Sequence, residues 1–121
     1  MFLIDKINKN MFKDVNTIYS RLKSSAKKRN IPFHLKLTDI DQIGCPMNCP
    51  VLGIRLNYNA REQEDDSPSF DRIDSTKPYS IDNVVIISWK ANRLKSNATL
   101  KELKMIVEFL DNHPDGCYSN E

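Results

Sequence analysis

The chain has 121 residues, with 18 basic and 16 acidic side chains and an apolar fraction of 40%. This size and composition fit one soluble globular domain with one modest core, and a formal net charge of +2 does not by itself indicate a nucleic-acid-binding protein. No stretch approaches the roughly 18 apolar residues that a membrane-spanning helix needs. The first ten residues lack the basic and long apolar regions of a secretory signal, so we expect the protein to stay in the cytoplasm of the cell that makes it, the host cell if it is phage-encoded.

The basic residues are unevenly distributed along the chain. They cluster at two places, early at Arg21, Lys23, Lys27, Lys28 and Arg29, and later at Lys90, Arg93 and Lys95. A chain of nearly neutral total charge can therefore still carry a basic face that tracks phosphates, although each single lysine is more often a solvated surface residue.

The first half of the chain predicts a helical platform over about residues 11–44. A helix over about 12–30 is indicated by apolar residues at three- and four-residue spacing, namely Val15, Ile18, Tyr19, Leu22 and Ala26. Residues 33–37 alternate and suit a short extended segment. Thr38 can cap a short helix that runs to Ile43 and ends at Gly44.

The second half predicts two strands and a helix, then a last helix. We expect a strand over 51–58 interrupted at Gly53, an exposed acidic loop over 59–67, a strand over 69–74, a loop over 75–82 and a buried strand over 84–87. Ser88 is a plausible cap for a helix from Trp89 to near Asn97. Thr99 and Glu102 predict a capping box for a helix over about 99–111, with a buried stripe of Leu100, Leu103, Ile106, Val107 and Leu110.

Three polar side chains should meet where this strand–strand–helix unit comes together. Asp71 lies on the first strand, Asn83 opens the second, and Asn92 lies one turn into the helix. Carboxylate and amide oxygens suit magnesium, with waters and phosphate oxygens completing the coordination shell. Taken singly, each residue could be only an ion-pair, turn or helix-surface residue, but their joint spacing favours a metal site.

The motifs and their order resemble the HNH or His-Me finger (ββα-metal) endonucleases. The likeness rests on Asp71-Arg72-Ile73, on Asn83-Val84 and on Asn92, nine residues after Asn83. It covers most of residues 20–110 and is closest to a phage-type subgroup with Asp-Arg-Ile-Asp in place of the usual Asp-His. The resemblance implies a small single α+β domain over 1–121, with the platform, a ββα-metal core over about 51–97 and the last helix packed around it.

The resemblance also implies roles for the site residues. Asp71 and Asn92 would bind Mg²⁺ or Mn²⁺, and Asn83 would pin the loop through backbone hydrogen bonds. The implied catalytic set is Asp71, Arg72, Asp74, Asn83 and Asn92, and the implied DNA contacts are Lys27, Lys28, Arg29, Lys90, Arg93 and Lys95.

Arg72 stands where the family has its histidine base, and a guanidinium only donates protons in hydrogen bonds at any working pH. Arg72 could instead bind the phosphate while another group activates water: Asp74, on the same strand face, or His34 from the platform. Alternatively, a metal-bound water supplies hydroxide, or the fold binds DNA without cutting.

A structural zinc site is a second, less favoured metal hypothesis. Its ligands would be Cys45, Cys49, His113 and Cys117, which have the right types but looser spacing than the familiar zinc knuckle. The odd cysteine count favours the alternative of a buried strand cysteine, a turn cysteine and a free tail thiol.

These patterns together predict a metal-dependent DNA endonuclease of phage or mobile-element type, with a homing or genome-processing role. One such site cuts one strand, so a monomer would nick and a homodimer could cut both strands. The rival hypotheses are a non-catalytic nucleic-acid-binding module that kept the fold, and a protein-interaction or inhibitor domain that uses the acidic segment 62–66.

Overall fold

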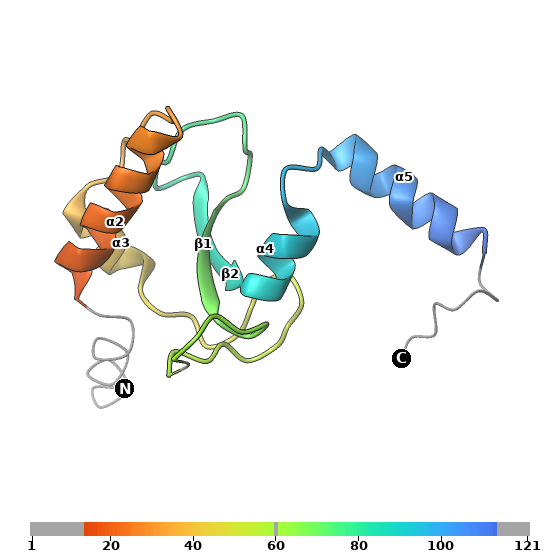
Figure 1. Cartoon of the computed structure of the whole chain (residues 1–121), viewed down its shortest axis with the longest axis horizontal. Helices are drawn as coiled ribbons and strands as arrows, with labels where there is room; N and C mark the ends of the chain where they lie inside the picture. Colours follow the sequence, from red (N-terminus) through yellow and green to blue (C-terminus); the bar gives the residue numbers. More distant parts are fainter. Residues whose placement is uncertain (1–13, 60, 114–121) are drawn as a thin grey trace.

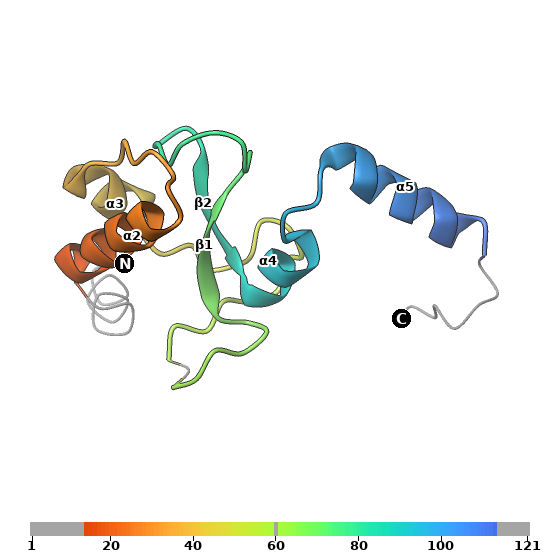
Figure 2. The same cartoon turned by 45° about the horizontal axis from the view of Figure 1, so that its top comes forward.

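The computed structural model describes residues 14–59 and 61–113 and shows a small α+β domain, as predicted. Within these residues the helices and strands follow the order α2 (Val15–Lys28), α3 (Leu37–Ile43), β1 (Pro68–Arg72), β2 (Val84–Ser88), α4 (Trp89–Lys95) and α5 (Leu100–Asp111). Helices α2 and α3 lie on one side of the β1–β2 hairpin, α4 lies on the other, and α5 extends beyond α4 (Figures 1 and 2). Among the described residues, no helix has the length and apolar character to span a bilayer.

Helix α2 forms where the apolar periodicity predicted it. The Asp14 carboxylate caps its start by accepting the Thr17 N–H at 2.8 Å. Ala26 is fully buried, and the Ile31 N–H donates to the Ala26 carbonyl at 2.8 Å as the chain leaves the helix. Asn30, at φ +58°, makes this exit. The helix packs onto a first core cluster that includes Leu35, Ile40, Tyr79 and Val84.

Helix α3 ends as predicted at Gly44 but begins earlier than predicted. Gly44 has φ +68°, a backbone conformation that glycine adopts without strain. Lys36, rather than Thr38, precedes the first turn, and its N–H donates to the Asp39 carboxylate at 2.8 Å. The prediction of a Thr38 cap is therefore wrong, because Asp39 supplies the capping oxygen from inside the helix.

The predicted strand over 51–58 is not formed. Instead, the chain reverses: Gly53 has φ +77°, its N–H donates to the Cys49 carbonyl at 2.8 Å, and the Cys49 N–H donates to the Ile54 carbonyl at 2.8 Å. Val51 lies on the outside of this turn with an exposed fraction of 61%. The apolar residues of this segment do not form a strand, since a tight turn around a left-handed glycine leaves Val51 and Leu52 exposed while Leu56 is buried.

The β1–β2 hairpin is antiparallel, with Asp71 opposite Val85 and Arg72 opposite Val84. Ile86 and Ile87 of β2 are each 1% exposed and belong to a second core cluster with Cys49, Leu56 and Ala91. Because consecutive residues of a strand point to opposite faces, the burial of both side chains shows that β2 is covered on both faces, which anchors the hairpin in the core.

Helix α4 begins directly after β2, as predicted. The Ser88 hydroxyl accepts the Ala91 N–H at 3.1 Å, which confirms Ser88 as the cap. The helix ends at Lys95, two residues earlier than predicted, because Ser96 turns to φ +43°. The direct junction of β2 and α4 places the first turns of the helix beside β1.

Helix α5 has the predicted capping box but not the predicted burial. The Glu102 N–H donates to the Thr99 hydroxyl at 3.1 Å, and the Thr99 N–H donates to the Glu102 carboxylate at 2.8 Å. However, Leu100 is 69% exposed and Val107 is 57% exposed, so the prediction that this stripe packs onto the domain is wrong for the described residues. The periodicity correctly predicted an amphipathic helix, but it carries no information on what covers the apolar face.

Candidate active site

A cleft of about 560 Å³ lies between β1, α4 and the end of α2. It brings together three of the five predicted catalytic residues, namely Asp71, Arg72 and Asn92. Asn83 and Asp74 do not line it. Arg29 of the platform and Tyr79 of the loop form another part of its wall.

Asp71 is held at the cleft by a lysine that follows Asn92 by one helical turn. The Lys95 Nζ lies 3.1 Å from the Asp71 Oδ2 and also donates to the Arg72 carbonyl at 3.0 Å. The Asp71 side chain is only 12% exposed, so this ion pair is partly shielded from solvent. Lys95, expected to be a contact to flanking DNA, therefore lies inside the site.

Asn92 is oriented by Ser69, a residue that the sequence analysis missed. The Asn92 Nδ2 donates to the Ser69 hydroxyl at 2.7 Å. Ser69 and Asp71 are two residues apart on β1 and therefore face the same side of the strand. The Asn92 amide and the Asp71 carboxylate therefore lie on the same side of β1. The two-residue spacing of Ser69 and Asp71 is the sequence signal that indicates a role for Ser69.

The donor set fits a hard divalent cation held by few protein ligands. Asp71 offers a carboxylate, and Asn92 offers its Oδ1, because its amide nitrogen is engaged by Ser69. Across residues 14–59 and 61–113, no group of three histidine, cysteine, aspartate or glutamate side chains is placed to hold a metal. Mg²⁺ commonly binds through one or two protein oxygens while water and substrate phosphate complete its shell, so two ligands suit it.

Two arginines converge on Tyr79 at the cleft wall. The Arg72 guanidinium carbon lies 5.3 Å from the centre of the Tyr79 ring, and the Arg29 Nη1 donates to the Tyr79 hydroxyl at 3.2 Å. Within the described part of the chain, neither guanidinium has a carboxylate within ion-pair distance. The cleft therefore presents two cationic groups that no described carboxylate neutralises in a direct ion pair, which favours the binding of an anion.

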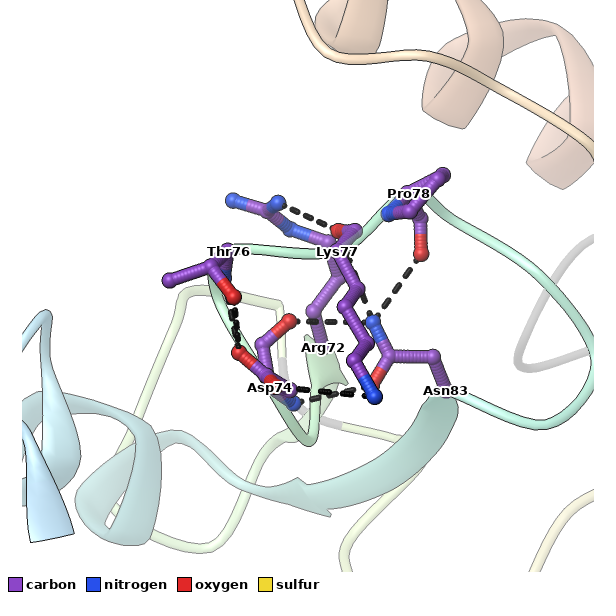
Figure 3. Close-up of polar contacts among 6 residues, drawn as sticks. All are labelled: Arg72, Asp74, Thr76, Lys77, Pro78 and Asn83. Atoms are coloured by element: carbon purple, nitrogen blue, oxygen red, sulfur yellow. Dashed lines mark hydrogen bonds and ion pairs between the residues drawn. The ribbon is translucent and has the colours of Figure 1, made fainter.

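The loop between the strands is pinned by Asn83, as the resemblance implied (Figure 3). The buried Asn83 amide donates to the carbonyls of Asp74 at 3.0 Å and Pro78 at 2.9 Å, and its Oδ1 accepts the Asp74 N–H at 2.8 Å. In the same loop, the Lys77 carbonyl accepts a hydrogen bond from the Arg72 Nη1 at 2.8 Å. Asn83 thus fixes the loop that orients Arg72 and carries Tyr79.

The two side chains considered as bases lie outside the cleft lining. Asp74 follows the end of β1, so it does not share a strand face with Arg72. Its carboxylate accepts the Thr76 hydroxyl at 2.6 Å and the Thr76 N–H at 2.9 Å, and these bonds hold its pKa below the usual value. His34 is an exposed residue whose backbone N–H donates to the Tyr79 carbonyl at 2.7 Å.

The remaining basic residues lie on the outer surface. Arg93 reaches the cleft rim but is paired with the exposed Asp65 of the acidic loop. Lys90 on α4, and Lys27 and Lys28 at the end of α2, are exposed. The predicted set of DNA contacts is thus divided between the site itself, at Arg29 and Lys95, and its surroundings.

The cysteines do not form a metal cluster among the described residues. The Cys49 thiol is 2% exposed and accepts the N–H groups of Ser88 at 3.2 Å and Leu52 at 3.4 Å. Burial raises its pKa, but these hydrogen bonds outweigh burial and lower the pKa to about 7. His113 stacks on Phe109 with ring centres 4.5 Å apart, and Cys117 lies outside the described residues, so the zinc hypothesis stays a prediction.

Comparisons with known proteins agree with this architecture. The sequence matches no protein-family model and no curated protein. Among solved structures, the fold is similar to that of the rare-cutting HNH restriction endonuclease PacI, with a TM-score of 0.56 and 22% sequence identity over 84% of this chain and 81% of that chain. The chain therefore has a small α+β fold similar to that of an HNH endonuclease.

Proposed function

We propose that this protein is a metal-dependent endonuclease that hydrolyses phosphodiester bonds in DNA. The observation that carries the proposal is the placement of Asp71 and Asn92 in one cleft with Arg29 and Arg72, neither of which forms an ion pair with a described carboxylate. A pair of hard oxygen donors next to cationic side chains suits a phosphate diester, whose charge increases toward the transition state. The similarity of the fold to an HNH restriction endonuclease supports the same class of reaction.

Asp71 and Asn92 would hold Mg²⁺ or Mn²⁺. Ser69 keeps the Asn92 amide nitrogen engaged, so that the amide oxygen is left for the cation. The bound ion would supply Lewis-acid activation of water and stabilisation of the leaving oxygen. Lys95 would exchange its contact with Asp71 for a phosphate or for solvent when the cation enters.

Arg72 and Arg29 would bind the scissile phosphate from the part of the cleft wall that they share with Tyr79. Both side chains are oriented by Tyr79, and Arg72 is further fixed by the Lys77 carbonyl, so little conformational entropy remains to be lost on binding. Neither arginine can remove a proton from water. Because Asp74 and His34 lie outside the cleft lining, we place water activation at the cation rather than at either side chain.

The exposed basic residues would track the flanking DNA backbone. Such contacts supply affinity that depends on salt but not on base sequence. A single cleft acts on one strand at a time, so the monomer would nick. The motif resemblance favours a phage or mobile-element enzyme.

The proposal is tested by incubating supercoiled plasmid with the purified protein and Mg²⁺ or Mn²⁺. We expect conversion to open circles that chelator stops and that Asn92→Ala reduces at least about a hundredfold. Asn16→Ala, an exposed change on α2, is the matched control and should nick at the wild-type rate. A folded protein without metal-dependent nicking would exclude the proposal.

A second candidate is a DNA-binding module without catalysis, and the arginine in place of the family's histidine favours it. In that case the protein would retard DNA in gels, with the same affinity in Mg²⁺ and in chelator. A protein-interaction domain, whose contact surface would be the exposed acidic segment 62–66, should give neither nicking nor retardation.

A further inference from the structure

Helix α5 carries an apolar face that the described residues leave in solvent. Leu100, Ile106 and Val107 are 69%, 53% and 57% exposed, and Leu110 is 38% exposed. No residue of the helix is buried. A helix of 12 residues is marginal in isolation, so burial of this face against a partner would stabilise it.

A charged stripe borders this face on one side. It consists of Lys101, Lys104, Glu108 and Asp111, at spacings of three, four and three residues that place all four on one flank of the helix. None of them forms an ion pair within the described residues. The stripe is basic in the first half of the helix and acidic in the second half.

We propose that α5 packs antiparallel against α5 of a second copy of this chain. In a two-fold antiparallel helix pair, the same flank of each helix meets its counterpart with the direction reversed. Lys101 then lies across from Asp111 of the second copy, and Lys104 lies across from Glu108, while Leu103 and Val107 pack between the helices. Four complementary contacts form, and no like charges are opposed.

The parallel arrangement lacks this match. In a parallel pair, the charged flank of one helix faces the opposite flank of the other, which carries the apolar Ile106. The charges would then be partly desolvated without partners. The order of charges along the stripe, basic first and acidic second, therefore favours a second α5 as the partner and an antiparallel orientation of the two helices.

The interface between the two α5 helices is small, so the dimer should be weak. A helix of 12 residues spans about 18 Å, so the buried area lies toward the low end of specific interfaces, and the dimer should dissociate on dilution. The inference does not depend on the proposed nuclease activity, because it concerns only the mass of the particle.

Sedimentation equilibrium over a hundredfold range of protein concentration tests the inference. The wild type should approach twice the chain mass of 14.0 kDa at the high end. Val107→Asp should remain monomeric, with unchanged far-UV circular dichroism, since this exposed side chain supports no described core. Leu52→Asp, an exposed change on the 51–54 turn, is the matched control and should dimerise as the wild type does.

A charge-swap experiment tests the direction of the helices. Lys101→Glu with Lys104→Glu gives an all-acidic stripe, and Glu108→Lys with Asp111→Lys gives an all-basic stripe. Each double variant should be monomeric alone, and an equimolar mixture should form a heterodimer. A mixture that stays monomeric, or double variants that each dimerise normally, would overturn the antiparallel pairing.

Other occupants give different results. If residues 1–13 of the same chain cover the face, the wild type stays monomeric at every concentration and their deletion causes association. If another protein covers it, the wild type and the deletion variant both stay monomeric. Either result would exclude the second copy as the occupant.

Discussion

Lys95 and Asp71 form an ion pair at the cleft, with the lysine ammonium 3.1 Å from the carboxylate oxygen and side chains that are 27% and 12% exposed. The carboxylate is the strongest candidate ligand for a cation, so the ammonium and the metal compete for one group. Cation binding and this ion pair are therefore thermodynamically linked.

Replacing Lys95 with methionine should raise the affinity for a divalent cation. The change leaves Asp71 unpaired but keeps the length of the side chain, and a partly shielded pair of this kind should contribute about 1.4 kcal/mol, or about tenfold in affinity. Mn²⁺ binding can be measured by electron paramagnetic resonance in the absence of DNA. Lys90→Met, on the exposed face of the same helix, should have no effect, and Asp71→Asn should abolish binding. Weaker binding by the Lys95 variant would contradict the competition.

Arg29 should contribute more to catalysis than Lys27, although both belong to the same basic cluster at the end of α2. Arg29 reaches the cleft through Tyr79, whereas Lys27 is exposed at the end of α2. We expect Arg29→Ala to lower kcat/KM for plasmid nicking about a hundredfold, and Lys27→Ala to weaken DNA affinity only a few-fold with kcat unchanged. Equal effects of the two variants on kcat would argue against a role of Arg29 at the scissile phosphate.

Asp74 should be dispensable as a base. Its pKa is lowered by the hydrogen bonds from Thr76, and a general base works best with a pKa near the working pH. Asp74→Asn keeps an oxygen that can accept from Thr76, so nicking should stay within about threefold of the wild-type rate. A loss comparable to that of Asp71→Asn, together with a changed pH–rate profile, would restore Asp74 as the group that activates water.

Asn83 should be the most sensitive position of the loop for stability. Asn83→Ala removes the partners of the Asp74 and Pro78 carbonyls and of the Asp74 N–H at a buried position. The free energy of unfolding should fall by about 2–4 kcal/mol, measured by urea denaturation. Asn16→Ala on α2 is the control and should cost about 0.5 kcal/mol or less. A comparable cost at both positions would mean that the pinned loop adds nothing to stability.

The Cys49 thiol should make stability rise with pH above neutrality. In the folded state its pKa is about 7, against 9.0 ordinarily, so between these values the unfolded chain binds more protons than the folded chain. The free energy of unfolding should therefore increase by about 2 kcal/mol from pH 6.5 to pH 9.5. Cys45→Ala should keep this rise and Cys49→Ala should lose it. Parallel pH curves for the wild type and Cys49→Ala would rule out the lowered pKa.

Local chemistry in the sequence predicted the hairpin, the caps at Ser88 and Thr99, and the closeness of Asp71 and Asn92. Ser88, Thr99 and Gly44 act within a few residues of their own positions, so their effects can be read from neighbouring residues. The spacing of Asp71 and Asn92 also follows from short elements in direct succession, because β2 runs into α4 without a loop. These features depend on distances along the chain.

The site contacts that the sequence did not predict have one physical origin, which is contact between residues distant in sequence. The errors at Thr38 and at residues 51–58 arise instead from local capping and turn geometry. Arg29 joins the cleft only because Tyr79, 50 residues later, accepts its hydrogen bond. Ser69 orients Asn92, which lies 23 residues later in the chain. The apolar stripe on α5 predicts a buried face, but the sequence pattern does not show which segment would cover it. Local patterns in the sequence thus predicted the α+β fold class, and the spacing and resemblance of the motifs singled out Asp71 and Asn92. Only the tertiary structure decided that Arg29 and Lys95 lie at the site and that the Asp74 carboxylate bonds to Thr76 of its own loop. It also decided that the apolar face of α5 stays exposed among the described residues. Packing between segments, which the sequence pattern does not specify, sets these contacts.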